Sequence, residues 1–292
     1  MFLQQLINGV TLGSTYALIA LGYTMVYGII LLINFAHGEI YMVGSFIALI
    51  LVVSYKVNIV AAFFAAMLGC MILGVLMERI AYRPLRHKNS NRLSALISAI
   101  GVSIFLSNLV LMLRGPQTTR FPDVIEYQFY SIGPAQISNL QILIIVISAA
   151  LMLGLQYIVM RTKVGKAMRA TSMDMQTAYL MGINVNRIVA ITFAIGSSLG
   201  AAAGVLVGIY FNAVSPLMGT MAGMKAFTAA VLGGIGSIPG AMLGGVLLGV
   251  AEVLGVAYLS SSYRDAIAFG ILIIILLIKP SGILGQRALK KV

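Results

Sequence analysis

The chain has 292 residues, of which 60% are hydrophobic and only 9% charged, and its mean hydropathy is +1.03. Soluble globular proteins carry about 25% charged residues, so this composition excludes that class and indicates an integral membrane protein. The net charge of +12 does not predict nucleic-acid binding, because most basic residues gather in three segments, a distribution that orientation in a membrane explains more simply.

The uncharged runs are about as long as a helix needs to be to cross a bilayer. We therefore expect an all-α polytopic membrane protein of about eight transmembrane helices, with a single transmembrane domain over residues 1–292. Two of the expected elements, 34–55 and 218–258, are broken or re-entrant. The expected elements are 5–31, 34–55, 58–78, 93–113, 140–160, 187–212, 218–258 and 265–279.

Charge distribution predicts the orientation of these elements. The loop 79–92, the segment 161–187 and the C-terminus hold most of the basic residues and are expected in the cytoplasm. The loop 114–139 balances two arginines against two acids and is expected outside. No basic residue precedes Lys56, so the first span lacks the charged start of a cleaved signal peptide and should be retained. The side on which residue 1 lies stays open.

The first broken element contains polar groups inside an otherwise uncharged run. A carboxylate at membrane depth usually faces protein or water and marks function. We expect residues 34–38 to be non-helical and Glu39 to lie in the first turn of a new helix, where an acid suits the helix dipole. Irregular backbone at this depth is tolerated where it lines a cavity, so Asn34, His37, Gly38 and Glu39 are candidates for a pathway wall. A structural hydrogen-bonding role for His37 is an equally open alternative.

The second broken element is interrupted by GGIGSIPG at 233–240, where the glycines and Pro239 disfavour a regular helix. Two interrupted hydrophobic segments, one in each half of the chain, are typical of a transport site built from half-helices. Gly233, Gly234 and Gly236 would supply backbone dipoles there. Lys225 is a further polar candidate for lining or gating the pathway.

Glycines at four-residue intervals permit close helix contacts in a membrane. Gly196, Gly200, Gly204 and Gly208 follow this spacing on one expected helix face. Packing within this chain is the favoured interpretation, and a seam with a second membrane subunit is the alternative.

The segment 161–186 is too long for a simple turn. Its small and apolar residues follow helical spacing, and Gly182 is placed to end the helix. We expect one short helix that docks on a cytoplasmic partner. The alternative is an interfacial helix that lies on anionic lipid through Lys166 and Arg169.

Sequence patterns of several other classes are absent. The chain has no phosphate-binding nucleotide loop, no HExxH zinc motif and no GxSxG nucleophile turn. Its single cysteine, Cys70, permits neither an intrachain disulfide nor a cysteine-rich metal site. We therefore expect a chain that is not an enzyme and that binds no metal or cofactor.

Several blocks closely resemble the LivH-type permeases of bacterial branched-chain amino-acid ABC importers. The resemblance extends over essentially the whole chain and is weakest over 114–139. The blocks are NGVTLGSTYALIALGYTMVYGI (8–29), INFAHGEIYMVGS (33–45), ERIAYRPLR (78–86), LISAIG (96–101), MGIN (181–184), GMKAFTAAVLGGIGSIPGAMLGG (223–245) and KPSGILG (279–285).

The resemblance implies a multi-pass subunit of the bacterial inner membrane that imports leucine, isoleucine and valine by alternating access. It implies a LivM-type second permease subunit, two cytoplasmic ATPase subunits that bind the ATP and magnesium, and a periplasmic amino-acid-binding protein. The segment 161–186 would be the coupling helix seated in an ATPase subunit. Its candidate coupling residues are Gly165, Arg169, Asp174, Ala178 and Gly182.

Other functions remain open at this point. Relatives of this family also move urea, amides or other neutral amino acids, so the substrate is undecided. The second permease subunit could be a homologue or a second copy. A proton-coupled carrier that uses His37 and Glu39, or a passive channel, is a less favoured alternative.

Overall fold

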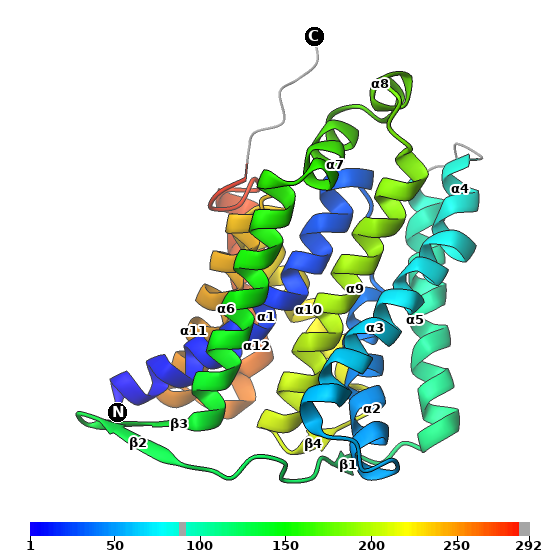
Figure 1. Cartoon of the computed structure of the whole chain (residues 1–292). Coiled ribbons are helices and arrows are strands. Elements are labelled where there is room, and N and C mark those ends of the chain that lie inside the picture. Colours follow the sequence, from blue (N-terminus) through cyan, green and yellow to red (C-terminus); the bar gives the residue numbers. More distant parts are fainter. Residues whose placement is uncertain (88–91, 286–292) are drawn as a thin grey trace.

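The computed structural model describes residues 1–87 and 92–285, and it is a helical bundle with short strands at one end (Figure 1). Along the chain the elements are α1 Phe2–Ile30, α2 His37–Val53, α3 Ile59–Met77, a π-helical turn Glu78–Tyr82, α4 Arg83–His87, α5 Arg92–Arg114, β1 Thr119–Arg120, β2 Phe129–Ile132, β3 Ala135–Ser138, α6 Asn139–Arg161, α7 Lys163–Met173, α8 Met175–Leu180, α9 Val185–Tyr210, β4 Ala213–Val214, α10 Met218–Gly233, α11 Ile238–Tyr258, a 3₁₀ turn Ser261–Tyr263 and α12 Arg264–Ile278.

Seven helical segments among the described residues are long and apolar enough to cross a membrane. The most apolar stretches of α1 and α9 are 83% and 78% buried, whereas those of α5 and α12 are 17% and 6% buried. Within a membrane, an exposed helix that is apolar on all sides faces lipid or another membrane subunit. The centre of the bundle is thus formed by α1 and α9 with α2, α10 and α11, and α3, α5, α6 and α12 lie outside it.

The two ends of the bundle differ in structure (Figure 1). At one end, which we call the β end, β1 pairs with β4 and β2 pairs with β3, both antiparallel. The side-chain amide of Gln4 donates to the carbonyl of Gln136 over 2.9 Å, so the start of α1 lies at the β end. The opposite end, the α7–α8 end, carries α7, α8 and the end of α12.

The first predicted interruption is confirmed, but it lies earlier than expected. Leu31 ends α1 in the left-handed conformation, and residues 31–36 are not helical. His37 and Gly38, expected in the break, already belong to α2, because the carbonyls of Asn34 and Ala36 accept the first amide hydrogens of the new helix. Glu39 lies in the first turn of α2, as expected.

Helix α2 begins inside the bundle and not at its end. A Cβ added to Gly22 of α1 would overlap the ring of His37. Ile30, the last residue of α1, is eight residues beyond Gly22, which is about 12 Å of helix. The non-helical residues 31–36 therefore lead the chain back into the bundle before α2 starts.

The second interruption is shorter than the predicted 233–240. It comprises residues 234–237, while Gly233 still belongs to α10. Pro239 occupies the first turn of α11, where its missing N–H costs nothing. The segment after α12 closes over this break, because Ile283 and Leu284 donate backbone hydrogen bonds to the carbonyls of Leu232 and Gly233, both at 2.9 Å.

The regularly spaced glycines pack within the chain, as favoured from the sequence. A Cβ on Gly208 would lie 2.6 Å from the hydroxyl oxygen of Ser45, and one on Gly204 would overlap the carbonyl of Tyr41. Gly196 and Gly200 face α1 and His37. These glycines let α9 approach α1 and α2 closely.

Two expectations about the basic segments were wrong in detail. The expected loop 79–92 is helical up to His87, because buried Glu78 pairs with Arg86 at 2.9 Å and keeps these charges on one helix face. The segment 161–186 forms two helices, α7 and α8, instead of one. They separate at Asp174, whose extended backbone and side chain cap α8.

Candidate substrate pathway

The structure brings four charged side chains and a tyrosine together across α1, α10, α11 and α12. Nζ of Lys225 lies 3.0 Å from Oε1 of Glu252 and 2.8 Å from Oδ1 of Asp265. Nε of Arg264 lies 3.4 Å from the same Glu252 oxygen. The hydroxyl of Tyr16 donates to Glu252 Oε2 over 3.1 Å. We call these five residues the Lys225 cluster.

Charges in the Lys225 cluster balance, with two cations against two carboxylates. The side chains of Lys225 and Glu252 are 7% and 1% exposed, whereas those of Arg264 and Asp265 are about half exposed. Ion pairs buried to this degree cost desolvation energy that their mutual attraction only partly offsets. A cluster of this kind inside a membrane domain therefore indicates a functional role.

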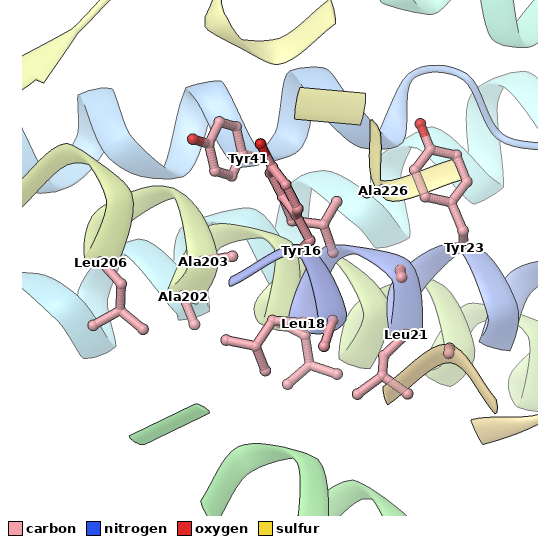
Figure 2. Packing of buried hydrophobic residues seen from close by; sticks show 14 of the residues in the cluster. Tyr16, Leu18, Leu21, Tyr23, Tyr41, Ala202, Ala203, Leu206 and Ala226 are labelled. Atoms are coloured by element: carbon pink, nitrogen blue, oxygen red, sulfur yellow. The ribbon is translucent and has the colours of Figure 1, made fainter. Parts of the chain in front are cut away.

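A cavity of about 300 Å³ adjoins the Lys225 cluster. Tyr16, Lys225 and Arg264 line it, and Tyr41 lies beside Tyr16 on the side of α1 opposite Leu18 and Leu21 (Figure 2). Its remaining wall is mostly apolar. The lining also includes residues in or next to β1 and β4, so the cavity lies toward the β end. The other lining residues are Leu12, Thr15, Ile19, Thr118, Val207, Phe211, Ala213, Ser215, Met218, Met221 and Ala222.

Glu39 belongs to a second, separate polar group. Its Oε1 accepts hydrogen bonds from the hydroxyls of Ser103 over 3.2 Å and Thr220 over 3.0 Å. These contacts join the start of α2 to α5 and α10. Glu39 lines a cavity of about 210 Å³ with Tyr23, Phe35, Ile100, Ser103, Thr220, Gly223 and Met224. We call it the Glu39 cavity.

Asn34 and His37 occupy positions that hold the first interruption in place. The Asn34 side-chain oxygen accepts from the hydroxyl of Tyr82 over 2.7 Å and from the backbone N–H of Ala36 over 3.1 Å. His37 is 1% exposed, and its ring meets that of Tyr23 edge-on with centroids 5.0 Å apart. These contacts favour a structural role, and a pathway role for either residue stays a prediction.

The glycine candidates lie at close backbone contacts. Gly38 faces α10, where a Cβ would lie 2.9 Å from the Cα of Gly223. Gly233 faces Gly240 across the α10–α11 break, and Gly234 faces the segment after α12. Gly236 lines a small cavity of about 80 Å³ near α7. Their role as a dipole lining of the pathway stays a prediction.

The first two candidate coupling residues fix α7 to α6. Gly165 is buried in the first turn of α7, where a Cβ would overlap the carbonyls of Ile158 and Val159. The Arg169 guanidinium donates to the same Val159 carbonyl. Both residues therefore attach α7 to the bundle.

The other three candidates shape α8. Asp174 accepts the backbone N–H groups of Gln176 and Thr177 and so caps the helix. Ala178 is buried, and Gly182 follows α8 with a φ of +83°. The outer face of α8 is exposed, with the side chain of Tyr179 69% accessible. This exposed helix is suited to docking, and a partner on it stays a prediction.

The sequence interpretation identified Lys225 but missed Tyr16, Glu252, Arg264 and Asp265. A signal existed for Glu252, which is the only charged residue between Lys225 and Arg264. It is the same signal that singled out Glu39. Arg264 and Asp265 follow a span end, where charges are ordinary, so only the packing of α10 against α12 reveals their role.

Comparison with known proteins agrees with this architecture. Residues 5–276 match the family described as the permease component of the branched-chain amino acid transport system. The high-affinity branched-chain amino acid permease protein LivH of Salmonella typhimurium is 49% identical over 100% of this chain and 98% of its own length. The corresponding BraD of Pseudomonas aeruginosa is 50% identical with the same coverage.

A solved structure shares the fold at much lower identity. PsaBC from Streptococcus pneumoniae, in complex with a Fab, aligns with a TM-score of 0.50 at 14% identity, over 96% of this chain and 93% of its own. With two full-length relatives of about half identical sequence and a match over residues 5–276, the chain belongs to the family of branched-chain amino-acid transport permeases, the membrane-spanning components of ABC importers.

Proposed function

We propose that the chain is the LivH-type subunit of an ATP-driven importer that moves leucine, isoleucine and valine across the bacterial inner membrane. The observation that carries this proposal is the full-length identity of 49% and 50% to two high-affinity branched-chain amino-acid permeases. The mostly apolar cavity beside a charge-balanced cluster supports it, because a branched-chain amino acid combines an aliphatic side chain with a zwitterion.

The proposed importer contains further subunits. A LivM-type permease would cover an exposed face of this chain, and two ATPase subunits would bind ATP and magnesium at the α7–α8 end. A periplasmic binding protein would deliver the amino acid at the β end. In this orientation the end of α12 and the described basic residues of α4, α6 and α7 lie on the cytoplasmic side, and the C-terminus, which we also expect in the cytoplasm, lies outside the described residues.

The mechanism we propose is alternating access around the two interrupted elements. Helix α10 lines both cavities. Lys225 lines the cavity beside the Lys225 cluster, and Thr220, Gly223 and Met224 line the Glu39 cavity. A shift of α10 relative to α2 therefore changes both cavities at once. ATP binding would drive that shift through α7 and α8, which are fixed to α6 and α9.

Reconstitution of the purified complex tests this function. The chain is co-expressed with the other proposed subunits, and uptake of radiolabelled leucine into proteoliposomes is measured with loaded binding protein. We expect co-purification of the ATPase subunits and uptake that requires ATP. Uptake by this chain alone under a pH gradient would contradict the proposal in favour of a proton-coupled carrier.

Competition in the same assay tests the substrate. Unlabelled isoleucine and valine should reduce leucine uptake, whereas urea and acetamide should not. Strong competition by urea or acetamide, with weak competition by valine, would assign the importer to another small neutral solute.

A further inference from the structure

We infer that the cavity beside the Lys225 cluster is a binding site within the permease for the zwitterionic head group of an aliphatic amino acid. This inference rests on the proposed function and deepens it, because it assigns recognition of the substrate's charges to residues of this chain. It places Lys225 and Arg264 against the ligand carboxylate and the α1 wall against its ammonium group.

The cationic wall of the cavity is formed by α10 and α12. Lys225 and Arg264 both line the cavity, and they share the Oε1 atom of Glu252 as a partner. An ammonium group has three donors and a guanidinium has five, so each cation retains donors beyond these contacts. Asp265, which also binds Lys225, is about half exposed, so this second pairing of Lys225 is partly solvated.

Helix α1 contributes acceptors to the same cavity, next to the cations. Thr15 and Tyr16 both line the cavity, but their hydroxyl hydrogens are already donated, to the carbonyl of Leu12 over 2.7 Å and to Glu252 over 3.1 Å. Each hydroxyl oxygen is left with lone pairs and no hydrogen to give. The ammonium and carboxylate groups of an α-amino acid are attached to one carbon, so acceptors that lie beside the cations can hold both groups of one ligand.

The rest of the cavity suits an aliphatic side chain. Leu12, Ile19, Val207, Met218 and Met221 contribute apolar surface. The volume of about 300 Å³ is at the small end of ligand pockets, which fits a single amino acid better than a peptide or a larger solute. The charges of the cluster sum to zero, so a neutral zwitterion enters without leaving a net charge buried.

Protection of an introduced cysteine tests this site directly. Ala222→Cys places a thiol on the cavity wall, and the natural Cys70 is fully buried, so the parent chain should not react. Labelling by a membrane-impermeant thiol reagent is followed on this chain, in the complete importer in membrane vesicles. We expect labelling from the β-end side, slowed several-fold by leucine but not by leucinamide, which lacks the carboxylate, or by isocaproate, which lacks the ammonium.

Charge variants in the Ala222→Cys background identify the residues. Lys225→Met alone removes the closest cationic partner of the buried Glu252 and leaves the cluster with a net negative charge, so the double variant Lys225→Met/Glu252→Gln is used to keep the cluster neutral. Arg264→Gln changes a half-exposed side chain and should not prevent folding. Loss of one charged hydrogen bond should raise the half-protecting leucine concentration by about tenfold or more in both. The matched control is Arg120→Gln, which removes an exposed arginine paired with Asp123 at the same end and should leave protection unchanged.

The outcomes separate this inference from the proposed function. Absence of labelling, equal protection by leucine and leucinamide, or full protection in both charge variants would overturn the site. ATP-driven leucine uptake is measured in parallel with the chain that lacks Ala222→Cys. Normal uptake without leucine protection contradicts the site alone, whereas absent uptake contradicts the proposed function whatever the labelling shows.

Discussion

At the scale of single residues, the contact between Gly22 and His37 sets how closely α1 and α2 approach. A Cβ on Gly22 would overlap the imidazole, and Gly200 of α9 approaches the same ring atoms. Gly22→Ala should therefore lower the stability of the protein by about 1–3 kcal/mol, the usual cost of overpacking. Thermal unfolding in detergent measures the effect.

A matched glycine and a second-site change control this prediction. Gly154 lies on the outer helix α6 with open space around it, so Gly154→Ala should not lower stability. If the overlap with His37 is the cause, adding Gly22→Ala to His37→Ala should cost much less than Gly22→Ala alone. Purely additive losses would contradict the contact.

Glu39 is the charged member of the Glu39 cavity, and its carboxylate is the acceptor for two hydroxyls. Glu39→Ala leaves Ser103 and Thr220 without that acceptor and should lower stability by about 1–3 kcal/mol. Glu39→Gln keeps an acceptor oxygen and should be nearly neutral for stability. Because Gln removes the charge from the cavity wall, both variants should lower ATP-driven leucine uptake.

Stability and uptake are compared with Glu126→Gln, an exposed carboxylate outside the helices, which should change neither. Unchanged uptake in Glu39→Gln would assign Glu39 a structural role only.

Residue patterns predicted the candidate site in part, for a definable physical reason. A charge inside an uncharged run carries its own signal, which made Glu39 visible and could have revealed Glu252. Arg264 and Asp265 lie at a helix start, where charged residues are common. Their membership in the cluster depends on Asp265 reaching Lys225, forty residues earlier in the chain, and sequence spacing does not encode that contact.

At the scale of elements, the break between α10 and α11 depends on glycine conformation. Gly234 and Gly236 both have positive φ, +106° and +92°. A Cβ on Gly234 would also collide with Gly285, whereas one on Gly236 has its nearest contact at 3.9 Å. Both alanine substitutions should cost backbone strain, and Gly234→Ala should cost about 1–3 kcal/mol more.

Each variant is the control for the other, and thermal unfolding in detergent compares them. Equal destabilisation would mean that the segment after α12 does not close over this break as the backbone hydrogen bonds indicate.

The connection between α8 and α9 gives a prediction for coupling. Gly182 has a φ of +83° and open space around it, so Gly182→Val introduces strain without a clash. This strain should displace α8 from its position before α9. We expect normal insertion of the chain in the membrane but reduced stimulation of ATPase activity by loaded binding protein.

Gly133 provides the matched control, because it has a φ of +58° and open space but lies in the β2–β3 turn at the opposite end. Gly133→Val should not reduce the ATPase subunits that co-purify with the chain or their basal activity. Equal stimulation of ATPase activity in Gly182→Val and the unchanged chain, per co-purified ATPase subunit, would remove the specific role of α8.

The ends of helices were predictable where the hydrophobicity changes sharply along the sequence. They were not predictable where charged residues pair inside the fold. Spans such as 93–113 and 140–160 agree with α5 and α6 to within one residue at each end. The loop expected at 79–92 is mostly helical because the charges of Glu78 and Arg86 neutralise one another. A hydropathy profile counts these two residues as separate polar groups and does not show their pairing. In the segment 161–186 the spacing of small and apolar residues predicted one helix, but the side chain of Asp174 caps α8 and so separates it from α7.

At the scale of the whole molecule, the two interrupted elements meet. Gly38 of α2 lies against Gly219 and Gly223 of α10, and Gly223 also lines the Glu39 cavity. Glycines at the closest contact leave no side chains between the two backbones there, and beside it the hydroxyl of Thr220 donates to Glu39 across the same crossing. The movement of α10 relative to α2 that we propose would take place at this crossing.

The orientation of the whole bundle is testable with two exposed tyrosines at its opposite ends. Tyr130 on β2 and Tyr179 on α8 are 50% and 69% exposed, and Cys70 is buried, so Tyr130→Cys and Tyr179→Cys each provide one reactive thiol. The positive-inside rule places the α7–α8 end in the cytoplasm. With the chain expressed alone, an impermeant thiol reagent should label Tyr130→Cys in spheroplasts and Tyr179→Cys only in inverted vesicles.

Co-expression of the ATPase subunits should then slow labelling at residue 179 and leave residue 130 unaffected, because α8 is the proposed docking helix. The reverse pattern of labelling would invert the topology and place the Lys225 cluster toward the cytoplasm, where the binding protein could not deliver substrate to it.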